Sequence, residues 1–150
     1  MKMRTLIFLL ITSMWFTSCS ASRDGYEISY YDNQKVMQVS LGNNKEFDQL
    51  VKELIDGIDG SYHAIVDEDV IEATKQKKCI EIILPDVIET TTREGKSIKF
   101  RKLLIPVNAF PDNSIVFFCG DKTYFTPPLV NSQGAQGVKR MKELCETNLN

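Results

Sequence analysis

The 150-residue chain has a single histidine, His63, a single tryptophan, Trp15, and no large excess of charge of either sign. Its 18 Lys and Arg oppose 20 Asp and Glu, a formal net charge of −2. A nucleic-acid-binding protein needs a basic excess to neutralise phosphates, so the charge balance argues against this class. With 43% hydrophobic and 25% charged residues, the composition is that of an ordinary folded domain rather than a disordered or fibrous chain.

The chain also lacks an apolar run long enough to cross a bilayer, which takes roughly 20 residues. Its longest such run, Leu6 to Phe16, follows the basic residues Lys2 and Arg4 and precedes small residues. This order of segments is typical of a secretory signal peptide. We therefore expect residues 1–18 to direct the chain across the inner membrane and to be removed.

The end of this segment carries a more specific pattern. Phe16-Thr17-Ser18-Cys19 resembles the lipobox of bacterial lipoproteins, although Leu is usual where Phe16 stands. The resemblance implies cleavage before Cys19 and lipid on its thiol, with residues 19–25 as a short polar tether. Ordinary cleavage after Ala21 or Ser22 is the alternative. The whole chain is similar in character to small lipoproteins of Bacteroides-type bacteria, which implies an anchor at the cell envelope, periplasmic or surface-facing, and no activity.

Residues 26–150 contain no linker or repeat and are predicted to form a single globular domain. Apolar residues recur from Phe47 to Ile58 at helical spacing after the helix-capping candidates Asn43 and Asn44, and a shorter helix is expected from Val138 to Cys145. β-Branched and aromatic residues predict strands at 26–31, 35–41, 79–92, 97–107, 115–119 and 123–126. Residues 62–78 are ambiguous: the sequence is compatible with a short strand at 62–66 and a short helix at 67–78.

Consecutive hairpins imply antiparallel pairing, and one-sided helices need a sheet to cover. The expected fold class is therefore α+β: a mainly antiparallel sheet of about five to six strands with two amphipathic helices packed on one face. The proposed core places one helix face against apolar strand positions: Leu50, Leu54 and Ile58 against Ile82, Phe100, Leu104 and Phe117.

Motifs for catalysis, cofactors or metals are absent. The sequence has no Walker loop, no G-x-G-x-x-G and no G-x-S-x-G elbow, and its cysteines lack the close spacing of a zinc site. We expect no cofactor, no metal and no catalytic group. The acidic residues Asp56, Asp59, Asp67, Glu68 and Asp69 do not fit a calcium loop, and 67–69 suit the first turn of a helix.

A stiff apolar segment is the best candidate for recognition. Tyr124, Phe125, Pro127 and Pro128 combine aromatic rings with proline, a composition common at binding surfaces. A proline pair after a strand also serves simply to end that strand.

With Cys19 committed to lipid, Cys79, Cys119 and Cys145 form an odd set in an oxidising compartment. The direction of the hairpins makes Cys119 and Cys145 the expected neighbours, as a disulfide or as two packed thiols. Three separate buried thiols are the alternative.

These observations favour an envelope-anchored, non-enzymatic binding or accessory module with an unidentified protein or glycan partner. One version is an inhibitor of a secreted enzyme that presents residues 127–137. The alternative is a small hydrolase that uses Asp67 and Asp69 with His63.

Overall fold

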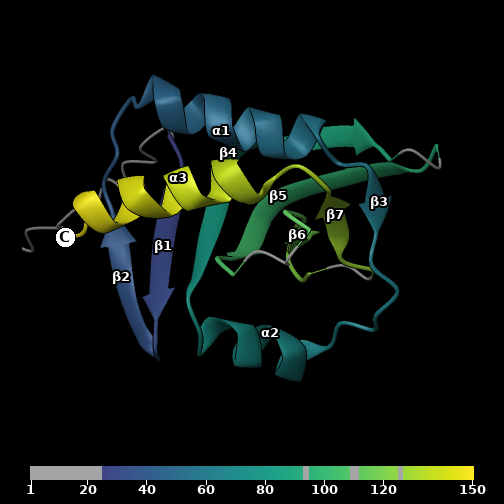
Figure 1. Ribbon diagram of the computed structural model, residues 1–150, viewed down its shortest axis with the longest axis horizontal. Coiled ribbons are helices and arrows are strands. Elements are labelled where there is room, and N and C mark those ends of the chain that lie inside the picture. The colour runs from purple at the N-terminus through teal and green to yellow at the C-terminus, as the bar shows by residue number, and fades with distance from the viewer. Residues whose placement is uncertain (1–24, 93–94, 109–111, 125–126) are drawn as a thin grey trace, which may run out of the picture.

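The computed structural model describes residues 25–92, 95–108, 112–124 and 127–150 (Figure 1). The predictions of a signal peptide in residues 1–18 and of lipid on Cys19 lie outside the described residues. The elements follow in the order β1 (Glu27–Asp32), β2 (Lys35–Val39), α1 (Lys45–Asp56), β3 (Gly60–Ser61), α2 (Glu68–Lys75), β4 (Cys79–Thr91), β5 (Ser97–Pro106), β6 (Ile115–Gly120), β7 (Leu129–Asn131) and α3 (Ala135–Thr147).

The strands form one seven-stranded sheet in the order β2-β1-β4-β5-β6-β7-β3, with every neighbouring pair antiparallel. The α+β class and the antiparallel pairing are confirmed. The predicted strand count of five to six is too low, and the predicted helix count of two differs from the three helices that the described residues form. The expected strand at 123–126 is, in its described part, only an isolated bridge between Gly120 and Tyr124.

Helix α1 begins where the sequence predicts a cap. The side chain of Asn44 accepts hydrogen bonds from the backbone N–H groups of Glu46 and Phe47, at 3.0 and 3.1 Å. These bonds satisfy two of the donors that every helix leaves open at its start. One face of the helix is buried, through Phe47, Val51, Leu54 and Ile55.

The other end of α1 is tied to β7 by a buried amide. Asn131, only 4% exposed, donates from Nδ2 to the carbonyl of Leu54 at 3.1 Å. A Cβ atom on Gly57 would lie 2.3 Å from that nitrogen, so this close approach requires glycine. Asp59 continues the junction by accepting a hydrogen bond from the Ser132 hydroxyl.

The sheet buries apolar side chains on both faces. The larger cluster joins α1 and α3 to Ile80, Ile82 and Leu103, while a smaller cluster joins Ile71 of α2 to Cys79, Leu104 and Phe118. Neighbouring residues of a strand point to opposite faces, which separates Leu103 from Leu104. Only α1 and α3 share a face, and they lie side by side, with α2 apart at the bottom of Figure 1.

This arrangement corrects the predicted core at two positions. Leu50 is only partly buried, packed against the larger cluster, and Leu104 belongs to another cluster. Leu54, Ile58, Ile82, Phe100 and Phe117 lie together in the larger cluster as expected. Leu104 lies instead in the smaller cluster beneath α2. The sequence run Leu103-Leu104-Ile105 is completely buried because helices cover both faces at this point.

The β4–β5 hairpin extends past its neighbours. β1 pairs with β4 only as far as Ile83, and β6 pairs with β5 only from Lys102 to Leu104. A register shift between Ile83 and Ile88 marks the bulge that Pro85 predicts. We call the part beyond it, residues 88–91 and 97–101, the distal arm; it runs to the right in Figure 1.

The end of the chain covers the outer edge of β2. Leu149 forms an isolated antiparallel bridge with Val39, and the backbone N–H of Ser40 donates to the carbonyl of Asn148 at 3.3 Å. The N–H of Asn150 donates to the carbonyl of Gln38 at 3.2 Å. These contacts leave this strand edge partly paired.

Candidate functional site: a groove beside the distal arm

A spacious hollow lies beside the distal arm, where β6 has ended and β5 continues. Its volume is about 860 Å³, within the range of ligand pockets. One wall comes from β5 and the turn before it, and the other from the segment after β3 and the loop before β7. The residues that line this distal groove are Ser61, His63, Val66, Thr92, Lys96, Ser97, Ile98, Lys99, Cys119, Tyr124, Pro127 and Leu129.

The structure brings part of the predicted recognition segment to this groove. Tyr124 and Pro127 line it. Pro128 is buried, and its carbonyl accepts a hydrogen bond from the Tyr62 N–H at 2.8 Å, which gives it a structural contact to the end of β3. Phe125 lies outside the described residues.

Tyr124 is held firmly in the wall of the groove. Its hydroxyl donates to Glu81 Oε1 at 2.5 Å, and its ring meets Phe118 edge-on with centroids 6.5 Å apart. The Lys102 ammonium lies 4.5 Å from the centre of the same ring, a favourable cation–π contact. The wall is therefore formed before any ligand arrives, which lowers the entropic cost of binding.

Glu81 is the centre of a polar cluster that the sequence analysis missed. Its carboxylate also accepts from the Tyr31 hydroxyl at 2.7 Å and pairs with the Lys75 ammonium at 3.0 Å, although its side chain is only 14% exposed. Burial alone would raise the pKa of Glu81, but the bonds from Tyr124, Tyr31 and Lys75 outweigh it and hold the pKa below its usual value. The sequence does contain one sign of this cluster: Glu81 is a single charged residue between Ile80 and Ile82 in an apolar strand.

The residues of the hydrolase alternative do not form an acid–base pair. Asp67 is the N-cap of α2, with Oδ1 accepting from the Val70 N–H at 3.0 Å, and Asp69 is exposed in the first turn. His63 is exposed at the groove. Within the described residues no hydrogen bond links His63 to either aspartate. The expectation that residues 67–69 start a helix is confirmed.

Acidic side chains do not gather as metal ligands. In the part of the chain that the structure describes, no three His, Cys, Asp or Glu side chains are placed to hold an ion. Asp59 instead bonds to Ser132 at the junction of α1 and β7.

Residues 127–137 do not form the projecting loop on which the inhibitor version relied. Leu129–Asn131 is strand β7, and α3 begins at Ala135. Leu129 and Asn131 are buried. Part of this segment is therefore packed into the fold. Residues 62–65 are exposed instead, and Ile65 is 86% exposed.

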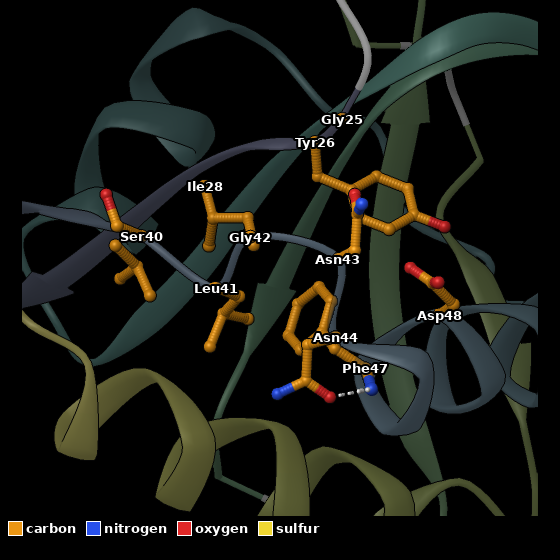
Figure 2. Close-up of a pocket in the computed structure, with 11 residues that line it drawn as sticks. Gly25, Tyr26, Ile28, Ser40, Leu41, Gly42, Asn43, Asn44, Phe47 and Asp48 are labelled. Atoms are coloured by element: carbon orange, nitrogen blue, oxygen red, sulfur yellow. Dashed lines mark hydrogen bonds between the residues drawn. The ribbon is translucent and has the colours of Figure 1, made fainter.

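A second pocket, of about 310 Å³, lies where the chain enters β1 (Figure 2). The Tyr26 ring packs against Phe47 with centroids 5.8 Å apart, and Figure 2 shows its hydroxyl turned toward Asp48. Burial, and then Asp48, raise the pKa of Tyr26. Asn44, which also lines this pocket, is engaged as the α1 cap. The polar groups here serve the fold.

The cysteines Cys79, Cys119 and Cys145 are free and buried. Cys119 and Cys145 belong to the larger cluster and Cys79 to the smaller one, on the other face. Burial raises the pKa of each thiol to about 12, so the reactive thiolate is scarce at neutral pH. Pairing of Cys119 with Cys145 on oxidation stays a prediction.

No protein-family model, curated protein or solved structure matches this chain. Among the described residues, no helix has the length and apolar character that a membrane span requires.

Proposed function

We propose that this chain is an envelope lipoprotein, anchored through Cys19, that acts as a non-enzymatic binding module and takes a partner protein in the distal groove. The single observation that carries the proposal is the groove itself. It is large, mixed in polarity and bounded by a wall that Glu81 and Phe118 hold in place. A concave, largely preformed hollow of this size, with polar groups fixed in its walls, is a common form of binding site.

The chemistry of the groove supports binding rather than catalysis. Among the described residues, its charged members are Lys96 and Lys99, and His63 also lines it. Neither of the aspartates in the hydrolase alternative lines it. An inhibitor of a secreted enzyme is one form that such a module takes, with the groove and residues 62–65 as its contact surface.

Photo-crosslinking in cells tests the groove. A photoreactive residue at the exposed, groove-lining Lys99 should give a discrete crosslinked product with one protein. The same residue at Lys52, exposed on α1, is the matched control. Equal products from both positions, or none from Lys99, would contradict the proposal.

Cell fractionation tests the anchor. Cys19→Ser should release the protein from the membrane fraction, because anchoring depends on acyl chains attached to this thiol. Ser18→Ala, a neighbouring change that keeps the thiol, is the control. Retention of Cys19→Ser in the membrane to the same extent as the parent would show that the anchor is wrong.

A further inference from the structure

The segment that carries α2 is fixed to the rest of the domain mainly at its two ends. The Tyr62 N–H donates to the Pro128 carbonyl at 2.8 Å, and the Val107 N–H donates to the Lys78 carbonyl at 3.1 Å. Between these two bonds, in the described structure, no backbone group of residues 63–77 bonds to another helix or strand. We call residues 63–77 the cover segment; its helix lies apart from α1 and α3, at the bottom of Figure 1.

Few side chains of the cover segment pack against the sheet. The structure describes every residue of this segment, and Ile71 is the one that is buried. Val66 is partly buried against the same smaller cluster. A hollow of about 400 Å³ lies beside α2, between Ile71 and Lys75 of the cover segment and Tyr124 opposite. Protein interiors are close-packed, so this hollow indicates that α2 contacts the sheet incompletely.

One ion pair adds to these apolar contacts. The Lys75 ammonium lies 3.0 Å from Glu81 Oε1 and 5.5 Å from the centre of the Tyr31 ring. The side chains of the pair are 21% and 14% exposed, so solvent screens their attraction less than that of an exposed pair. Among the described residues, no other ion pair joins the cover segment to the rest of the domain. Lys75 and Ile71 therefore make the main side-chain contacts that keep α2 on the sheet.

We infer that the cover segment opens away from the sheet as a unit while the rest of the domain stays folded, and that the Lys75–Glu81 ion pair holds it closed. Local opening of this kind occurs where apolar burial is low and few hydrogen bonds must break. Opening exposes the apolar residues beneath α2, which are Cys79, Leu104 and Phe118. Glu81 pairs with Leu104 across the two strands, so the exposed surface is apolar with a carboxylate beside it. The inference does not rest on the proposed binding function.

Hydrogen exchange and thiol labelling, both at low denaturant concentrations, test the inference. The α2 amides and the Cys79 thiol should react through one opening that depends only weakly on denaturant, because it exposes a small part of the protein surface. The Leu54 amide of α1 should exchange by global unfolding, with a steep dependence on denaturant. Fraying of α2 in place would expose its amides but not the Cys79 thiol. Labelling of Cys79 only at the rate that global unfolding allows would therefore overturn the inference.

Substitution of Lys75 tests whether the ion pair holds the segment closed. Lys75→Gln should speed both α2 exchange and Cys79 labelling about tenfold, because the closed state loses a charge-assisted contact. Lys77→Gln, exposed at the end of the same segment, is the matched control and should change neither.

The direction of the labelling change separates opening from a simple charge effect. Burial and Glu81 raise the pKa of Cys79, and Lys75 opposes them. Loss of the Lys75 charge alone would therefore leave less thiolate and slow the labelling of Cys79. Faster labelling of Cys79 in Lys75→Gln, with the labelling of Cys145 unchanged, would support the inference. Unchanged or slower labelling of Cys79 would overturn the role of the ion pair.

Discussion

The sheet face beneath α1 and α3 is packed with aliphatic and aromatic side chains, whereas the face toward α2 carries the Glu81 carboxylate among tyrosines. The first face buries residues such as Phe47, Leu54 and Met141, each at most 3% exposed. On the second face, Ile71 is the one buried residue that α2 contributes. Apolar burial is large but non-directional, while hydrogen bonds fix geometry. The first face therefore provides stability, and the second holds Tyr124 at the groove.

The largest loss of stability is expected from a substitution in the first face. Leu54→Ala should lower the free energy of unfolding by about 2–5 kcal/mol, because it removes buried methyl groups and leaves a cavity. Lys52→Ala, exposed on the same helix, should change it by less than about 0.5 kcal/mol. Denaturant midpoints measure both. Equal shifts would contradict the assignment of this helix face to the core.

The next largest loss of stability is expected from a substitution in the second face. Glu81→Ala leaves the Tyr31 and Tyr124 hydroxyls without their acceptor, so the free energy of unfolding should fall by about 1–3 kcal/mol. Glu89→Ala, on the same strand but in the exposed pair with Lys99, should lower it much less, because solvent screens an exposed ion pair. The same denaturation experiment compares them. A Glu81→Ala shift no larger than that of Glu89→Ala would show that the cluster is not a stabilising contact.

The third effect follows from pH. Since folding lowers the pKa of Glu81, its ionised form stabilises the fold above the ordinary pKa of 4.5. This stabilisation is lost as the pH falls through the lower pKa of the folded state. The difference in free energy of unfolding between the parent and Glu81→Gln should therefore be greatest near neutral pH and shrink in acid. A difference that stays constant with pH would rule out ionised Glu81 as its source.

The smallest effect concerns the thiols. Native protein should react slowly with an alkylating reagent at all three buried cysteines, because burial raises each pKa to about 12. Cys79, under the eight-residue α2, should react before Cys145, which lies on α3 and is buried in the larger cluster, because less apolar cover makes local opening easier. Peptide mass spectrometry after timed labelling measures the order. Faster labelling of Cys145 would reverse the ranking of the two faces.

Local patterns in the sequence predicted the strong elements. The apolar spacing from Phe47 to Ile58 and the cap at Asn44 yield α1, and the prolines at 85 and 106 fall at a bulge and a strand end. β3 and β7 were missed because neither is long enough to show a pattern of its own. β7, Leu129–Asn131, forms between β6 and β3 through tertiary pairing rather than local propensity.

The groove was only half predictable. Tyr124 and Pro127 stood out by composition, but nothing local shows that His63 and Lys99, far apart in the chain, face the same hollow. Glu81 was missed because a single carboxylate in an apolar strand gains its meaning from Tyr31 and Tyr124. Contacts between such distant positions follow from the strand order, which hydrophobic patterns do not encode.

The placement of β1 has a mechanical consequence. The described chain enters the sheet at Gly25 and passes at once into β1, which is hydrogen-bonded to β2 on one side and β4 on the other. Those bonds run across the strand, so a pull along β1 from its amino end loads both ladders in shear, with all their bonds sharing the force. A pull at right angles would open them one at a time. A force applied through residues upstream of Gly25 and along this strand would therefore act in the direction in which the domain best resists unfolding.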